Sequence, residues 1–144
     1  MILNSDSIYN ELDKVLIEIY NSDHGFALTG SRFFGNHNDN SDYDFFANYE
    51  KKVIDFLERL GFKQITVDTY RDSQIVRIYR RHFESQGDID IMLVHSFRIK
   101  AQAQHILSTL QLDWNSVKKC APSTMTQLWE SAYRLAACSQ KTFF

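Results

Sequence analysis

The chain has 144 residues, of which 44% are hydrophobic and 14% aromatic, and its formal net charge is −2. This length and apolar content suffice for one domain with its own core, so we expect a single domain over residues 1–144. The small net charge argues against a protein that grips nucleic acid through a broad basic surface. No run approaches the ~20 apolar residues of a membrane-spanning helix, and no signal-peptide pattern is present, so we expect a cytoplasmic protein that does not enter a membrane.

The first predicted elements are two helices and two short strands. Apolar residues at helical spacing predict an amphipathic helix over residues 6–20. A short apolar run at 26–29 predicts a strand, and a second strand follows a polar loop and begins near Asp42. A covering helix is predicted over 51–60, because its apolar residues share one face and Gly61 follows it.

Two further β-like runs, 63–69 and 74–82, are joined by a polar turn and predict a hairpin, and 87–94 predicts another strand. The run at 74–82 carries several arginines. They are either solvated residues of an edge strand or ligands of a triphosphate, since guanidinium groups suit phosphate oxygens. The spacing of the arginines does not decide between the two.

From about residue 96 to 140 the pattern becomes helical. Thr124 and Gln127 match a capping box for the second helix of this region. Two apolar stripes are expected to face a core. The stripes consist of Ile99, Ala103, Ile106, Leu107 and Leu110, and of Met125, Leu128, Trp129, Ala132 and Ala136.

The stretch from Gly30 to Asp44 begins with a glycine-serine turn and ends with an Asp-x-Asp pair. Successive side chains of a strand point to opposite faces, so Asp42 and Asp44 should share one face. Two like charges at this spacing repel unless a cation lies between them, which predicts a divalent-metal site. Gly30 lets a ligand approach the backbone closely, and the Ser31 hydroxyl can donate to phosphate oxygens. Phosphate at one end and metal at the other predict a nucleotide site.

The whole pattern, Gly-Ser-Arg-x-x-Gly-x5-Ser-Asp-x-Asp, resembles the signature of the minimal nucleotidyltransferases of the DNA polymerase beta superfamily. Its fixed positions are Gly30, Ser31, Arg32, Gly35, Ser41, Asp42 and Asp44. The family also has a third carboxylate on a neighbouring strand, between apolar residues. Asp90 matches this frame, because Ile89 and Ile91 flank it, and Asp88 is the alternative. The resemblance covers about residues 26–94.

The resemblance implies an α+β fold, in which a small mixed β-sheet carries the carboxylates on one face and helices pack mainly on the other. It implies an enzyme that transfers a nucleoside monophosphate, AMP by default, from a nucleoside triphosphate to an acceptor hydroxyl. Gly30 and Ser31 would bind the β- and γ-phosphates, with Arg32 beside them. The catalytic residues, which would also hold two Mg²⁺ ions that Mn²⁺ can replace, are Asp42, Asp44 and Asp90.

The acceptor and the oligomeric state stay open. The chain is shorter than the antibiotic-modifying members of the family, which carry an additional helical region for their substrate. This difference argues against a small antibiotic as the substrate. A partner protein, a tRNA and a small molecule stay open as acceptors, and a homodimer is one way to complete the pocket. The alternative function is a non-catalytic module of the same fold, which binds a nucleotide or acts as an antitoxin by contact alone. The intact Ser31 and the three carboxylates favour the enzyme.

Overall fold

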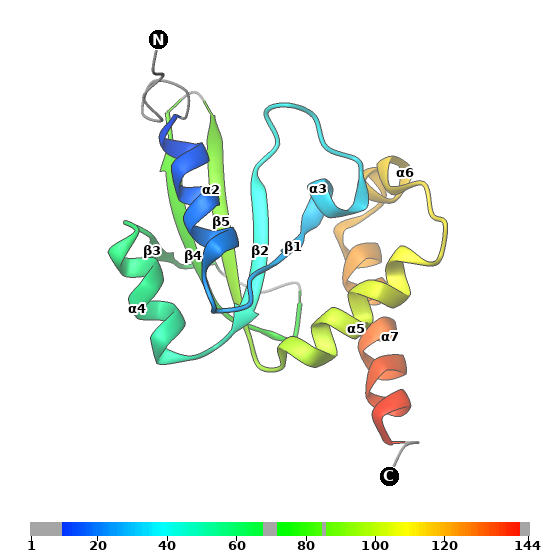
Figure 1. Ribbon diagram of the computed structural model, residues 1–144. Coiled ribbons are helices and arrows are strands. Elements are labelled where there is room, and N and C mark those ends of the chain that lie inside the picture. The colour runs from blue at the N-terminus through cyan, green and yellow to red at the C-terminus, as the bar shows by residue number, and fades with distance from the viewer. Residues whose placement is uncertain (1–9, 68–71, 85, 142–144) are drawn as a thin grey trace.

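The computed structural model describes residues 10–67, 72–84 and 86–141. A five-stranded mixed sheet in the order β1-β2-β5-β4-β3 forms the centre of the molecule (Figure 1). The strands are β1 (Ala27–Thr29), β2 (Tyr43–Asn48), β3 (Lys63–Ile65), β4 (Ile75–Phe83) and β5 (Gly87–Val94). β2 and β5 run parallel, and the other neighbouring pairs are antiparallel, including the predicted β3–β4 hairpin. The expected α+β class is confirmed.

Six helices lie in the described part of the chain. They are α2 (Glu11–Asn21), α3 (Gly30–Phe34), α4 (Lys51–Arg59), α5 (Phe97–Ser108), α6 (Trp114–Lys119) and α7 (Pro122–Lys141). None of these six helices is long and apolar enough to cross a membrane.

Three of the helices differ from the prediction. Asn10 is the N-cap of α2, and its side chain accepts a hydrogen bond from the first turn, so this helix begins after Asn10 rather than at residue 6. Residues 1–9 lie outside the described part of the chain. α7 begins at Pro122, a residue that suits the first helical position, so Thr124 lies inside the helix and the predicted capping box is wrong. α6 was not predicted, because six residues are too few for a periodic pattern.

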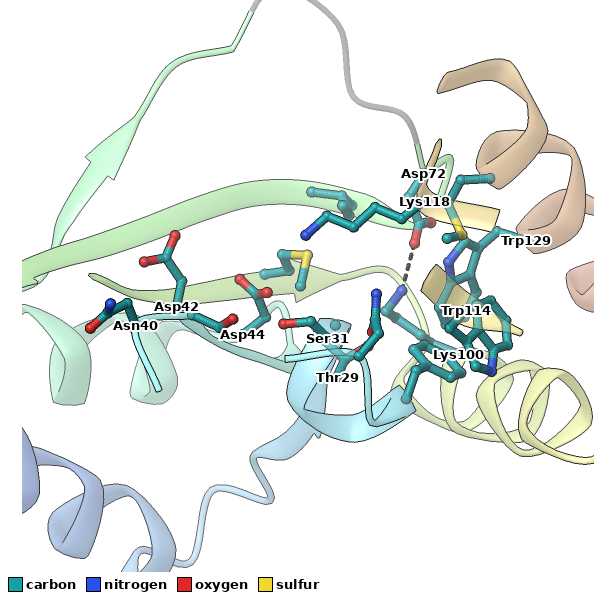
Figure 2. A pocket seen from close by; sticks show the side chains of 17 residues that line it. Thr29, Ser31, Asn40, Asp42, Asp44, Asp72, Lys100, Trp114, Lys118 and Trp129 are labelled. Carbon is teal, nitrogen blue, oxygen red and sulfur yellow. Dashed lines mark hydrogen bonds and ion pairs between the residues drawn. The ribbon is translucent and has the colours of Figure 1, made fainter. Parts of the chain in front are cut away.

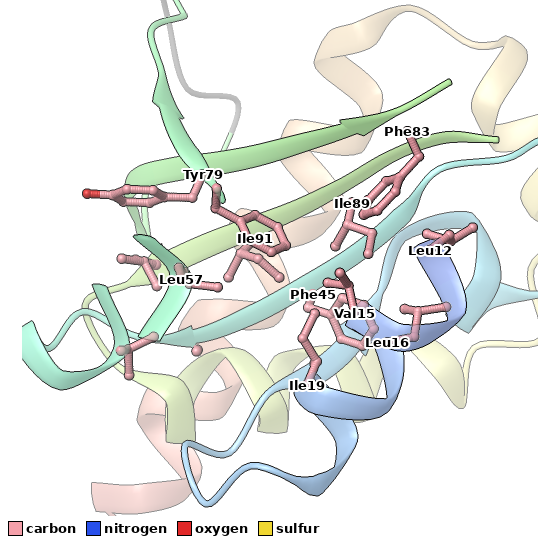
Figure 3. Packing of buried hydrophobic residues seen from close by; sticks show 14 residues of the cluster. Leu12, Val15, Leu16, Ile19, Phe45, Leu57, Tyr79, Phe83, Ile89 and Ile91 are labelled. Atoms are coloured by element: carbon pink, nitrogen blue, oxygen red, sulfur yellow. The ribbon is translucent and has the colours of Figure 1, made fainter. Parts of the chain in front are cut away.

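One face of the sheet is covered by α2 and α4 (Figures 1 and 3). Phe45, Ile89 and Ile91 point to this side and are completely buried, because alternate residues of a strand share a face. Ile19 of α2 and Leu57 of α4 pack against them through the apolar stripes that their spacing predicted. This face buries the main core and carries none of the motif carboxylates.

The opposite face carries Asp44, Phe46 and Asp90, and α5 covers one end of it. The ring centres of Phe46 and Phe97 lie 5.0 Å apart, and the Lys100 ammonium lies 5.4 Å from the Phe46 ring. The expectation that helices pack mainly on the carboxylate-free face therefore holds for α2 and α4 but is wrong for α5. The periodicity of the α5 sequence predicted an apolar stripe on this helix, but it did not predict which element the stripe packs against.

α5 and α7 form a second apolar core beside the sheet. Its buried residues are Ala103, Leu107, Trp129, Ala132, Tyr133 and Ala136. The predicted stripes thus pack mainly on each other. Leu110 is the exception, because it follows the end of α5 and is 49% exposed.

Buried polar contacts tie this helical part to the sheet. The Gln104 side chain donates to the Leu28 carbonyl at 2.9 Å and accepts from the Thr29 hydroxyl at 2.5 Å. The Lys100 ammonium donates to Asp72 Oδ2, also at 2.5 Å, just before β4 begins. Because buried polar groups are costly when they lose a partner, these contacts fix α5 relative to β1 and β4.

Candidate active site

The glycine-serine turn and the Asp-x-Asp pair lie against each other. Thr29, the last residue of β1, pairs with Asp44 of β2, so the turn that follows β1 lies over the Asp44 side chain. A Cβ atom on Gly30 would lie 2.4 Å from Asp44 Oδ2, and the φ angle of Gly30 is +67°. Only glycine fits here without displacing the carboxylate or straining the backbone.

Asp42 precedes β2, and the start of β5 orients its side chain. Asp42 Oδ1 accepts a hydrogen bond from the Asp88 amide at 2.9 Å. Gly87 leaves room for this contact, because a Cβ atom there would lie 2.9 Å from the same oxygen. A second glycine thus makes space for a second carboxylate.

Asp44 carries a charge that its surroundings do not balance. The pKa of Asp44 is raised from 3.8 to about 7, mainly by burial and then by the charges of Asp90 and Asp42, while Arg80 opposes these effects. At neutral pH this group is poised to accept either a proton or a cation.

Asp90 is the Cα partner of Asp44 across the parallel β2–β5 pair, so the structure brings these two together. Both carboxylate oxygens of Asp90 bind Arg80, Oδ1 to Nε at 2.7 Å and Oδ2 to a terminal nitrogen at 2.9 Å. The hydrogen bond to Asp90 raises the pKa of Arg80. Asp88 lies farther from Arg80 Nε, at 3.3 Å, and its other oxygen lies 2.6 Å from His82 Nδ1. Asp90 therefore has a bidentate partner in Arg80, whereas Asp88 does not.

The β4 arginines are not residues of an edge strand, because β4 lies between β3 and β5. Arg81 donates to the Leu60 carbonyl and to Glu11, at 2.7 and 3.0 Å. The guanidinium carbon of Arg77 lies 5.1 Å from the centre of the Tyr49 ring. The edge-strand interpretation is therefore wrong.

The carboxylates by themselves do not make a full set of metal ligands in the described part of the chain. Within the described residues, no group of three or more His, Cys, Asp and Glu side chains has the geometry to hold a metal ion. Asp42 and Asp44 nevertheless fit Mg²⁺ by their chemistry, since both are hard oxygen donors, and burial together with the charges of Asp90 and Asp42 raises the pKa of Asp44. Asp90 differs from them, because Arg80 occupies both of its oxygens.

A pocket of about 570 Å³ lies beside the turn and the carboxylates (Figure 2). Asp42 and Asp44 lie toward one end, Trp114 and Trp129 toward the other, and Ser31 lies between them. The size is that of a typical small-ligand site. The ends of β1 and β2 and the start of α3 supply the polar end, and Phe34 of α3 together with α6 and α7 supplies the aromatic end.

Arg32 contacts the loop beside this pocket. Its guanidinium donates twice to the Ser41 carbonyl, at 2.9 and 3.2 Å, and lies 3.9 Å from the centre of the Tyr43 ring. Arg32 does not line the pocket, whereas Gly30 and Ser31 do. In this geometry Arg32 holds the loop that leads into Asp42.

A buried charged network at the pocket wall was not predicted from the sequence. Asp72 Oδ2 accepts from Lys100 Nζ and from the Tyr133 hydroxyl, both at 2.5 Å. The Lys100 ammonium also lies 3.8 Å from the centre of the Trp129 ring, and burial lowers the pKa of Lys100. The available signal was the helical spacing of Lys100 with Ala103, which places a cation on the apolar face of α5.

Comparisons with protein-family models, with curated proteins and with solved structures found no match. The function of the site must therefore be argued from its residues and their geometry.

Proposed function

We propose that this chain is a nucleotidyltransferase, which transfers a nucleoside monophosphate from a nucleoside triphosphate to an acceptor hydroxyl. The observation that carries the proposal is the contact between Gly30 and Asp44 at the polar end of one ligand-sized pocket. The glycine-serine turn, whose backbone and hydroxyl groups can donate to phosphate oxygens, lies there beside the paired carboxylates Asp42 and Asp44. This combination suits a polyphosphate bound with a divalent cation.

Each residue of the polar end has a role in this reaction. Gly30 and Ser31 bind the terminal phosphates, the serine through its hydroxyl donor. Asp42 and Asp44 would hold Mg²⁺, which supplies charge stabilisation for the attacking and leaving oxygens when it is bound. The acceptor oxygen forms a bond to the α-phosphorus, the bond to the bridging oxygen of the β-phosphate breaks, and pyrophosphate leaves with that electron pair. The acceptor hydroxyl gives its proton to a neighbouring base or to water.

The direct test incubates the purified chain with each nucleoside triphosphate, labelled at the α-phosphate, and Mg²⁺. Protein and tRNA fractions are supplied as acceptors. We expect pyrophosphate release and label on one acceptor class, both abolished by EDTA. Nucleotide binding without pyrophosphate release from any of the four nucleotides would instead support a non-catalytic binding module.

We expect Asp90→Asn to lower kcat/KM for transfer by about 10²-fold or more, and Asp88→Asn by less than about tenfold. Asp90 lies opposite Asp44 and holds Arg80 with two hydrogen bonds, whereas Asp88 makes one longer contact with Arg80. The two variants are matched, because each replaces one of the two carboxylates that contact Arg80 by a neutral amide. The opposite ranking would assign the third carboxylate to Asp88.

We expect Gly30→Ala to lower transfer by about 10²-fold, because the new methyl group would displace the Asp44 carboxylate. Gly25→Ala is the matched control. Gly25 has a similar φ angle of +70°, but an added Cβ atom there meets nothing within 4 Å. Both variants should lose about 1 kcal/mol of stability through backbone strain, measured by urea unfolding. Equal activities of the two variants would show that the close contact with Asp44 is unimportant.

A further inference from the structure

The aromatic end of the pocket has a composition that phosphate and metal do not explain. Phe34 of α3, Trp114 of α6, and Met125 and Trp129 of α7 line it. The ring centres of Phe34 and Trp114 lie 4.2 Å apart with a tilt of 35°. A planar, apolar group is the chemistry that such a wall accommodates.

Of the two indoles, Trp114 is the one that has surface left for a ligand. Trp129 is only 8% exposed, and the Lys100 ammonium lies 3.8 Å from its ring centre. Trp114 is half-buried and lines the same pocket. A ring that enters this end therefore contacts Trp114 in preference to Trp129.

The short helix α6 also contributes a cation to the pocket. Lys118 lies one turn after Trp114, and its side chain extends along the pocket in the direction of the carboxylates (Figure 2). Lys119, the next residue, is exposed and does not line the pocket. α6 thus presents an aromatic ring and an ammonium group to the same cavity.

We propose that α6 is the recognition element for the nucleoside triphosphate, with Trp114 contacting the base and Lys118 contacting the polyphosphate. This inference rests on the proposed function, since it assumes that the polar end holds the phosphates. A single molecule with a planar ring at one end and a polyphosphate at the other matches both ends of the cavity. Contact between a base and an aromatic side chain tolerates any base, so the proposal concerns nucleotides as a class.

The test compares the binding of ATP and of inorganic tripolyphosphate, each with Mg²⁺, by calorimetry. The wild-type chain should bind ATP at least about tenfold more tightly than tripolyphosphate. Trp114→Leu should weaken ATP binding about tenfold or more and leave tripolyphosphate binding unchanged. Lys118→Met should weaken both ligands by a similar factor, and Lys119→Met should weaken neither.

The outcomes separate this inference from the proposed function. Equal wild-type affinities for ATP and tripolyphosphate would overturn the base contact without the use of any variant. Normal ATP binding by Trp114→Leu, or an equal loss for both ligands, would overturn the role of Trp114. If any of these three results is found while the wild-type chain still transfers nucleotides, only the inference about α6 fails and the proposed function stands. If the wild-type chain binds neither ligand and transfers nothing, the proposed function fails with it.

Discussion

Asp44→Asn is expected to abolish nucleotidyl transfer and, without metal, to make the folded chain more stable at pH 8. Asp44 lies against the turn at Gly30, and the charges of Asp90 and Asp42 act on it. Removal of a metal ligand should lower transfer by several orders of magnitude. The amide removes a buried charge that its neighbours repel, which should raise the free energy of unfolding at pH 8 by roughly 2 kcal/mol.

The sign of the pH dependence follows from the raised pKa of Asp44. Its pKa is about 7 in the folded chain and 3.8 without the surroundings of the site. As pH rises from about 4 to 7, the unfolded state has already lost this proton while the folded state still holds it. The contribution of Asp44 to stability is therefore complete below pH 4 and is lost by about pH 7 to 8. Asp44→Asn should match the wild-type chain near pH 4 and exceed it at pH 8.

Urea unfolding at several pH values without metal measures the effect of pH on stability. Thermal unfolding with and without Mg²⁺ and ATP measures the effect of the ligands, which should raise the melting temperature of the wild-type chain and not that of Asp44→Asn. Asp23→Asn, at an exposed position, is the control and should behave as the wild type. A variant less stable than the wild type at pH 8 without metal would show that the charge of Asp44 is balanced. An equal effect of Mg²⁺ and ATP on both proteins would remove Asp44 from the metal site.

The largest expected loss of stability comes from Lys100→Met. This change leaves Asp72 buried without its cation, and breaking a buried pair in this way costs about 3–5 kcal/mol. The Lys100 and Asp72 side chains are 2% and 9% exposed and bind at 2.5 Å. The loss should appear as a lower urea midpoint and a lower melting temperature.

An exposed pair of the same types is the matched control. Lys51 binds Asp55 at 3.0 Å on the surface of α4, where the side chains are 89% and 51% exposed. Lys51→Met should change stability by about 0.5 kcal/mol or less. The double variant Lys100→Met with Asp72→Asn should recover much of the loss, because no unpaired charge remains buried. Similar losses for Lys100→Met and Lys51→Met would contradict the energetic role assigned to the buried pair.

Local pattern predicted most of the elements and the centre of the site. The alternation of strand side chains placed Asp42 and Asp44 on the face opposite the main core, and the apolar spacing of α4 identified its buried side. These predictions depend on periods of two and 3.6 residues, which neighbouring positions encode directly. The sequence predicted that Gly30 lets a ligand approach the backbone, whereas the close approach in the structure is that of the Asp44 carboxylate.

By itself, then, the sequence determined the strands, the main helices and the residues of the polar end. Only the tertiary structure decided that Arg80 binds Asp90, that Arg32 does not line the pocket, and that α5 covers part of the carboxylate face. It also decided that Lys100 is buried against Asp72 and that α6 supplies Trp114 to the pocket. The physical reason is that the partners in these contacts depend on strand register, loop path and helix packing, which local periodicity does not encode.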